Sequence, residues 1–435
     1  MTATTPEGLQ ADVLVVGGGM AGAIAALAAR AAGARVVVAR RSPGATALSS
    51  GAISVAPHRP AHPDEPLFAR RGPLDAARAV AATSPDHPYA RLGLDALDDA
   101  LAFAARELGG LLAPALERPR VLATAFGSAV SAALCQRSME AGDLLAVRGP
   151  LAVAGLAGHL AFDAGLVAAG LARFAARGGP RAHAVAVDLP AVVAPAAKPY
   201  DLARALEAPG AAEELGEALR GVLPGGAGAA LLPPVLGLDP AARVPERVAA
   251  AAGLPVAETL SDVPSVPGLR LQRALDDRLR EAGVVIVTAA VAAGWAAPGE
   301  AVDAGGTPVR ASAWVLATGR FVGGGVARRG TLFEPALRLP VQAAEGREAG
   351  VHLAARPAAS LTVRDRRAPQ PLLSAGLRVD AGLRPLDERG RQVHACLFAA
   401  GAVIGGHEQA TDGTGLGVAI LTGWLAGRAA AAAAR

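Results

Sequence analysis

The chain has 435 residues, of which 52% are apolar, 18% are charged and only 3% are aromatic. This composition excludes an intrinsically disordered chain, and the length allows two or three domains with a large buried core. The 42 basic and 38 acidic side chains leave a net charge of +4, and no basic block is interleaved with aromatic residues, so nucleic-acid binding has little support. The 53 glycines and 33 prolines predict short elements with close backbone approaches.

The chain has only two cysteines, Cys135 and Cys396, which lie far apart in the sequence. An iron–sulfur cluster needs about four thiolates, so we expect neither such a cluster nor a metal site within this chain. The first residues lack the basic segment of a signal peptide, and the most apolar stretch, 151–176, is interrupted by charged side chains. We therefore expect a protein that is cytoplasmic, or peripheral at the inner face of the cell membrane.

The strongest local signal lies at the start of the chain. Asp12 to Val16 form an apolar run typical of a strand buried on both faces, and Gly17, Gly19 and Gly22 follow as G-x-G-x-x-G before a helical stretch. The first glycine permits a tight turn, the second lets backbone approach a phosphate, and the third lets the helix lie close to the strand. This order favours a nucleotide site at the helix amino terminus over a purely structural turn.

One element of a dinucleotide site is missing. Such sites carry an acidic residue about 20 positions beyond the glycine loop, which holds the adenosine ribose, whereas here the strand 35–39 is followed by Arg40 and Arg41. Arg40 could contact a cofactor phosphate, the ligand could lack an adenosine half, or the arginines could form a solvated strand end. The departure favours a mononucleotide such as FMN, with FAD as the alternative.

The segment 43–57 contains Ser50 and Gly51, whose small groups would let backbone lie against a ring or a pyrophosphate, although a plain turn would look the same. From about residue 61 to 264 helical patterns alternate with Pro/Gly loops, which predicts an inserted cap or substrate region. There His87, Tyr89 and Arg91 cluster, and we expect Asp86 to cap a helix and Tyr89 to pack, with a ligand role for the cluster as the alternative. His159 and Asp163 could share a helix face, and we expect no metal there.

The final part of the chain restores the α/β pattern. A helix near 265–283 carries Arg270 in a row of arginines, either as a solvated face or, facing a cleft, as the cation for a substrate phosphate. Two strands end in loops that contain glycine, one at Thr318 and Gly319 and the other at Gly401. Gly415 lies just before the start of the last helix. A helix amino terminus at this place suits an electron-rich flavin carbonyl.

The predicted fold class is α/β: a Rossmann-like flavin-binding domain with a parallel sheet, interrupted by an inserted α+β cap or substrate region. The first part of the flavin domain spans 1–60, the insertion spans 61–264, and the second part spans 265–435.

The motifs GGGMAG, SSGAISV, HPYARLG, SVPGLRLQ and VLATGRFVGGGVARRG, together with LFAAGAVIGG and GLGVAILTG near the end, resemble the B subunit of anaerobic glycerol-3-phosphate dehydrogenase. The wider layout is similar to that of fumarate reductase flavoproteins. The resemblance implies a flavin-dependent enzyme, usually with FMN, that pairs with a larger flavoprotein subunit and with an iron–sulfur subunit. It implies oxidation of sn-glycerol 3-phosphate to dihydroxyacetone phosphate with a quinone as acceptor, and membrane contact only through the partners.

The resemblance also implies cofactor contacts from the glycine loop, from Ser50 and Gly51, and from the residues Thr318, Gly319, Gly401 and Gly415. Ala402 stands where many flavoproteins have an acidic contact to the ribityl chain. We expect His407 as the base that takes the hydroxyl proton and Arg270 or Arg320 as the phosphate clamp. The alternatives are a non-catalytic flavin electron-relay or assembly subunit, and a stand-alone dehydrogenase of fumarate-reductase or ketosteroid type.

Overall fold

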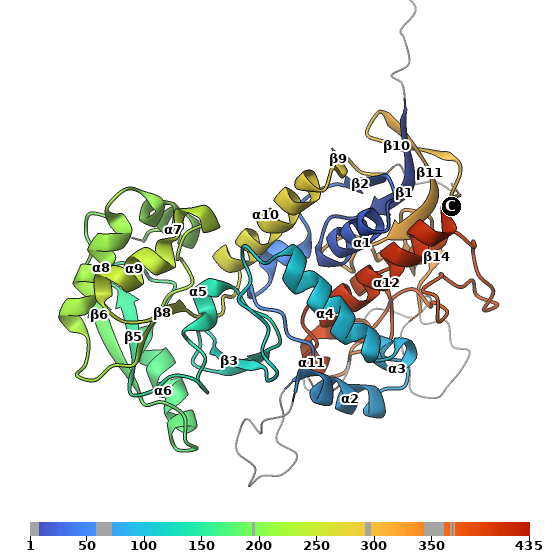
Figure 1. Ribbon diagram of the computed structural model, residues 1–435. Helices are drawn as coiled ribbons and strands as arrows, with labels where there is room; N and C mark the ends of the chain where they lie inside the picture. Colours follow the sequence, from blue (N-terminus) through green and yellow to red (C-terminus); the bar gives the residue numbers. More distant parts are fainter. Residues whose placement is uncertain are drawn as a thin grey trace, which may run out of the picture. The chain divides into compact units, whose positions relative to one another are not determined.

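The computed structural model describes residues 8–57, 72–193, 196–291, 297–342, 361–365, 368 and 370–435. The chain divides into two compact units (Figure 1). Unit 1 consists of residues 1–45, 77–107 and 275–435, and unit 2 consists of residues 46–76 and 108–274.

Unit 1 is built on a six-stranded sheet. Five strands run parallel in the order β9, β2, β1, β11 and β15, and β10 pairs antiparallel with the start of β11. The central strands are apolar almost throughout, because helices cover both faces of a parallel sheet. The strands are β1 Leu9–Val16, β2 Val36–Arg40, β9 Val285–Thr288, β10 Ala301–Ala304, β11 Thr307–Leu316 and β15 Leu397–Ala399.

Two helices of small residues, α1 (Met20–Ala31) and α12 (Gly417–Ala433), pack closely against each other in unit 1 (Figure 1). A Cβ atom built on Gly423 would lie 2.5 Å from the Ala21 carbonyl oxygen, and one built on Gly427 would lie 2.1 Å from the Ala25 carbonyl oxygen. Since no side chain fits at these distances, the glycines set the separation of the helix axes. Part of the alanine and glycine content therefore has a packing cause.

The remaining elements of unit 1 surround this core. Helix α4 packs against α12, and β12, β13 and β14 form a small antiparallel sheet. These elements are α3 Pro88–Leu92, α4 Asp95–Glu107, β12 Ala327–Arg329, β13 Thr331–Glu334, β14 Leu339–Pro340, the 3₁₀ turn η5 Gly401–Val403 and α11 Gln409–Asp412. The 3₁₀ turn η1 (Ala45–Leu48) and helix α2 (Pro73–Thr83) cross the boundaries of the two units.

Unit 2 contains a second parallel sheet, with the strand order β6, β5, β7, β8. Apolar clusters cover both of its faces. Its strands are β5 Leu151–Leu156, β6 Ala182–Val187, β7 Ala229–Leu232 and β8 Val256–Glu258, and its helices are α6 Ala164–Ala175, α7 Pro199–Glu207, α8 Ala211–Val222 and α9 Val244–Ala252. The antiparallel pair β3 Arg120–Ala123 and β4 Ala129–Ala132, the helix α5 Arg137–Glu140 and the turn η2 Pro240–Ala242 complete it. Helix α10, Val266–Glu281, begins in unit 2 and ends in unit 1.

The predicted Rossmann-like domain with a parallel sheet is present in unit 1. Each strand and helix expected around the glycine loop forms, with ends that differ by a few residues. The inserted region, expected to be α+β, has a parallel α/β sheet as its main element. The units also divide differently from the predicted boundaries: 77–107 belongs to unit 1 because α4 packs on α12, and 46–57 belongs to unit 2. Among the described residues, no helix combines the length and apolar character needed to cross a membrane.

Candidate functional site

The sheet of unit 1 brings together three segments that are far apart in the sequence. Val16, Leu316 and Ala399 lie in register at the carboxyl ends of β1, β11 and β15. The Ala317 amide donates to the Val16 carbonyl, and the Ala400 amide donates to the Leu316 carbonyl, both at 2.8 Å. The loops that begin at Gly17, Thr318 and Gly401 consequently leave the same edge of the sheet. Ligands of doubly wound folds bind at this edge.

The glycine loop has the tight geometry that its motif predicts. Gly17 has a φ of +116°, and a Cβ atom there would lie 2.2 Å from the Ala317 carbonyl oxygen. A Cβ atom on Gly22 would lie 2.0 Å from the Gly17 carbonyl oxygen, which lets α1 start directly against β1. Helix α1 begins after Gly19 with no side-chain cap and no acidic residue in its first turn. The positive dipole end of the helix at this place suits a phosphate.

The start of α12 has the same open character. Its N-cap residue, Leu416, gives no side-chain hydrogen bond, and its first turn has no acidic residue. The Thr414 hydroxyl just before it is buried without a hydrogen-bond partner, and so is the Thr318 hydroxyl at the end of β11. Buried hydroxyls without partners require a polar ligand or water. These groups fit a flavin, whose ring carbonyls and ribityl hydroxyls would take such hydrogen bonds.

Arg40, a predicted cofactor contact, is already paired. Its guanidinium binds both carboxylate oxygens of Asp276 on α10, at 2.5 and 2.8 Å, with only 9% of the Arg40 side chain exposed. The Arg40 Cδ atom lies 2.3 Å from a Cβ position built on Gly18, so this side chain covers the glycine loop. Asp276 thus places an acidic group at the end of β2, but its carboxylate is bound to Arg40. No sequence motif indicated this pair.

Ser50 and Gly51 lie in unit 2. Gly51 has a φ of +87°, and a Cβ atom there would lie 2.3 Å from the Pro267 Cβ atom. The Gln136 side-chain amide donates to the Gly51 carbonyl at 3.1 Å. The glycine is therefore required by its own packing in unit 2, and its contact with a flavin stays a prediction.

A cluster of buried polar side chains lies in unit 1 around the loop that follows β15. The rings of His87 and His407 meet edge to face with their centroids 5.8 Å apart, and Tyr89 lies against His87 at 4.6 Å. All three residues are buried, and the most exposed of them, His407, has only 4% of its surface accessible to solvent. His407 Nδ1, His87 Nε2 and the Tyr89 hydroxyl have no hydrogen-bond partner. The Oδ2 atom of Asp412 lies 3.9 Å from His87 Nε2.

Burial dominates the titration of this cluster. It lowers the pKa of His87 to about 4 and, with the positive charge of Arg320 nearby, lowers the pKa of His407 well below its ordinary value. Burial also raises the pKa of Asp412 and of the Tyr89 hydroxyl. Both imidazoles are therefore neutral at pH 7, and a neutral imidazole can accept a proton.

The cap of helix α3 defines the tautomer of His87. His87 itself is the N-cap residue, and its Nδ1 accepts a hydrogen bond from the Tyr89 backbone N–H at 3.1 Å. The neutral ring therefore carries its proton on Nε2, which makes the unpartnered atom a donor. The expected cap by Asp86 was wrong, because the histidine nitrogen performs that role. The sequence favoured packing for Tyr89 over a ligand role for the cluster of His87 and Tyr89, and only the tertiary structure places His87 beside His407.

Arg320 holds the same loop in place. Its guanidinium donates to the carbonyls of Ala402 at 3.1 Å, Ile404 at 3.1 Å and His407 at 3.0 Å, and also to that of Leu373. Burial lowers its pKa to about 10, so it stays charged at pH 7. A role for Arg320 as phosphate clamp stays a prediction, since most of its donors already bind backbone carbonyls.

Arg270 lies at the centre of a buried network in unit 2. Its Nη1 donates to Glu258 at 2.6 Å, to the Gln136 side-chain oxygen at 2.8 Å and to Ser138 at 3.0 Å, and the other guanidinium nitrogens donate to the Gly237 carbonyl. Only 2% of the residue is exposed, which rules out the solvated face predicted for this position. Binding of a substrate phosphate by Arg270 stays a prediction and would require these bonds to be exchanged.

His159 and Asp163 do not share a helix face. Asp163 is the N-cap of α6 and accepts a hydrogen bond from the Leu166 amide at 3.0 Å, while His159 lies in the turn before the helix. Within the described part of the chain, no group of three or more His, Cys, Asp or Glu side chains is arranged to hold a metal ion.

Comparison with known proteins now defines the class. The profile of the FAD binding domain family matches residues 12–418, so the chain belongs to this family of flavoproteins. The solved structures that it resembles include a 3-ketosteroid delta1-dehydrogenase from Sterolibacterium denitrificans, at 14% identity and a TM-score of 0.44 over 97% of this chain and 99% of that one. A flavocytochrome c3 fumarate reductase matches at 12% identity and a TM-score of 0.40, over 98% of this chain and 79% of that one.

The curated relatives are more specific. A probable B subunit of anaerobic glycerol-3-phosphate dehydrogenase from Halobacterium salinarum is 32% identical, over 98% of this chain and 99% of that protein. The B subunit of anaerobic glycerol-3-phosphate dehydrogenase from Pectobacterium carotovorum is 30% identical, over 94% of this chain and 96% of that protein. The chain is therefore a flavin-dependent dehydrogenase that belongs to the B-subunit family of anaerobic glycerol-3-phosphate dehydrogenases, which confirms the resemblance seen in its motifs.

Proposed function

We propose that this chain oxidises sn-glycerol 3-phosphate to dihydroxyacetone phosphate, as the B subunit of a quinone-linked complex. The observation that carries the proposal is the pair of neutral, buried histidines at the loop after β15, since oxidation of an alcohol requires a base that accepts the hydroxyl proton. The names of the curated relatives supply the substrate.

His407 is the proposed base. Its Nδ1 is free of protein partners and its ring is neutral at pH 7, because burial lowers its pKa. The Nε2–H of His87 is a free donor beside it, suited to hold the same substrate oxygen. A bound flavin would accept the hydride that leaves C2 of the substrate. As the hydroxyl proton moves to His407, the Nε2–H of His87 orients the oxygen that becomes the ketone carbonyl.

For the cofactor we propose FMN, with FAD as the alternative. The glycine loop 17–22 and the start of α1 would hold its phosphate, and Thr318, Gly319, Gly401, Thr414 and Gly415 would lie along the ribityl chain and ring. The Arg40–Asp276 pair favours the mononucleotide, because it covers Gly18 where a dinucleotide continues toward adenosine. Mass spectrometry of the compound released on denaturation tests this choice, with the mass of FMN expected.

The proposed partners are the larger flavoprotein subunit and the iron–sulfur subunit of the same complex. The chain has two cysteines, too few for a cluster, so electrons would leave through a partner that carries one. The proposed location is the cytoplasm, with contact to the inner face of the membrane only through these partners.

The direct test is anaerobic addition of sn-glycerol 3-phosphate to the purified, flavin-containing chain. The expected result is loss of the oxidised flavin absorbance, with glycerol as a control that causes none. Should the absorbance persist while the assembled complex turns over, the chain is an electron-relay or assembly subunit and the proposal fails. Isolation without any iron–sulfur partner would instead favour a stand-alone dehydrogenase.

A further inference from the structure

We infer that unit 2 holds a second ligand site, for a small organic anion with an apolar body. The site is a pocket of about 460 Å³ lined by the loop 144–150 and by the segment 174–181. A volume of this size accommodates a drug-sized ligand. The pocket contains none of the residues assigned above to the flavin or to the proposed reaction, so the inference does not depend on the proposed function.

The pocket lies at the amino ends of two neighbouring strands. β5 begins at Leu151, directly after one of the loops, and β6 begins at Ala182, directly after the other. The Leu151 amide donates to the Arg181 carbonyl at 2.7 Å, which ties the two loops to the sheet. Ligands of doubly wound sheets bind at the opposite, carboxyl edge. The ligand-binding edge common to such folds therefore does not account for this pocket.

The inner wall of the pocket is apolar. Leu144 and Phe174 are buried side chains of the core beneath it, and Val147 and Leu145 also line it. Much of the two loops consists of glycine and proline, which contribute no side-chain hydrogen-bond donors or acceptors to the pocket. A ligand that fills this space must have an apolar body, because an apolar wall cannot satisfy buried polar groups.

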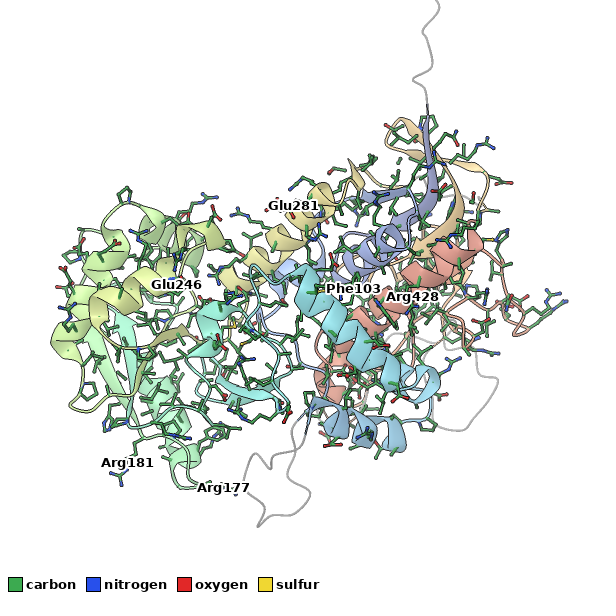
Figure 2. All side chains as sticks on the ribbon, viewed as in Figure 1. Phe103, Arg177, Arg181, Glu246, Glu281 and Arg428 are labelled. Carbon is green, nitrogen blue, oxygen red and sulfur yellow. The ribbon has the colours of Figure 1, made fainter. Side chains whose placement is uncertain are left out.

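The rim of the pocket is positively charged. Arg148, Arg177 and Arg181 line it, all three are exposed, and no acidic residue lines the pocket. Figure 2 shows Arg177 and Arg181 at the same end of unit 2. Within the part of the chain that the structure describes, none of the three side chains forms an ion pair or a hydrogen bond.

The carboxyl end of α6 accounts for only one of these charges. Arg177 follows that helix end, where a cation is favoured by the helix dipole. Arg148 and Arg181 belong to the loops that precede β5 and β6 and have no such counterpart. Three cations around one apolar pocket attract a carboxylate, sulfonate or phosphate head group while the body fills the pocket.

The test is titration calorimetry with 8-anilinonaphthalene-1-sulfonate, an apolar anion, on the flavin-containing protein. We expect saturable binding that weakens with salt, and a Kd raised at least about tenfold by the double variant Arg177→Glu, Arg181→Glu. The lysine pair Arg177→Lys, Arg181→Lys keeps the charge and is expected to keep most of the affinity.

The matched control is the double variant Arg204→Glu, Arg220→Glu, which changes the net charge equally from exposed positions on α7 and α8 that do not line the pocket. It is expected to leave the Kd within about twofold. Equal weakening by the control, or an unchanged Kd in the charge-reversed pocket variant, would overturn the inference. Because all substituted side chains are exposed, unchanged thermal unfolding is expected and checks that the variants fold.

Discussion

The imidazole of His87, which caps helix α3, meets the imidazole of His407 edge to face, with the two ring centroids 5.8 Å apart. Each ring has one nitrogen without a hydrogen-bond partner, and the side chains are buried. A buried polar atom without a partner destabilises a fold unless a ligand or water binds it, and we propose that the substrate oxygen binds these two nitrogens.

The first prediction concerns the base. His407→Gln keeps the approximate size of the side chain but cannot accept the proton, so turnover of sn-glycerol 3-phosphate by the assembled complex is expected to fall about 10²- to 10⁴-fold. Flavin content should stay unchanged. His183→Gln, at an exposed position of unit 2, serves as the control and should retain full turnover. Wild-type turnover in His407→Gln would show that the base lies elsewhere.

The second prediction concerns pH. The folded-state pKa of His87 is about 4 and its unfolded value is 6.5, so the unfolded state binds protons first as the pH falls. This histidine costs no stability above about pH 6.5, and between pH 6.5 and 4 it lowers the free energy of unfolding by up to about 3 kcal/mol. His87→Asn keeps a side-chain acceptor for the cap and removes the titration. Denaturant unfolding at several pH values should show a flatter profile in the variant, and an equally steep one would contradict the assignment.

The third prediction concerns the unpaired hydroxyl before α12. Thr414→Val has nearly the same shape, and it should raise the Kd for the flavin about five- to tenfold by removing one hydrogen bond. The flavin-free protein should be equally stable or more stable, since a buried hydroxyl without a partner is lost. Thr422→Val is the contrasting control: Thr422 donates to the Val418 carbonyl and accepts from the Gly401 amide, so this variant should lose stability even without flavin. An unchanged flavin Kd in Thr414→Val would place the cofactor elsewhere.

The fourth prediction concerns the buried ion pair of unit 2. Glu258→Gln leaves the Arg270 guanidinium buried without a counter-charge, which should lower the free energy of unfolding by about 3 to 5 kcal/mol. The partly exposed pair Arg247–Glu213 provides the comparison, and Glu213→Gln should have a much smaller effect. Chemical unfolding of both variants gives the measurement. Equal losses would mean that burial does not decide the contribution of these pairs.

The fifth prediction concerns the packing of α1 on α12. Gly427→Ala places a Cβ atom 2.1 Å from the Ala25 carbonyl oxygen, so the two helices must separate and the melting temperature should fall. Gly221→Ala, at an exposed position near the end of α8 with no atom within 4 Å of the new Cβ atom, should instead raise stability by about 0.5 to 1 kcal/mol. Opposite signs of the two stability changes distinguish a glycine required for helix packing from one that only lowers helix propensity. A change of the same sign in both variants would contradict this account of the interface.

Several features were predictable because they depend on local order along the chain. An apolar run, three glycines and a small-residue helix specify strand, turn and helix by backbone sterics alone, and the ends of β11 and β15 follow the same rule. Parallel strands then bring their carboxyl ends to one edge, so Gly17, Thr318 and Gly401 meet as expected. The sequence motifs also carried the family resemblance.

The pairings between distant side chains were not predictable. Asp276 on α10 neutralises Arg40, Glu258 pairs with the buried Arg270, and the cap of α3 places His87 against His407. Each pair joins residues on elements whose relative position is set by packing of the whole unit, and a histidine or arginine looks the same in a sequence whether it is buried or solvated. The sequence alone determined the class of cofactor loop and the family. Only the tertiary structure decided which charged groups are already paired and which polar atoms remain free for chemistry, because both depend on burial and on contacts between distant segments.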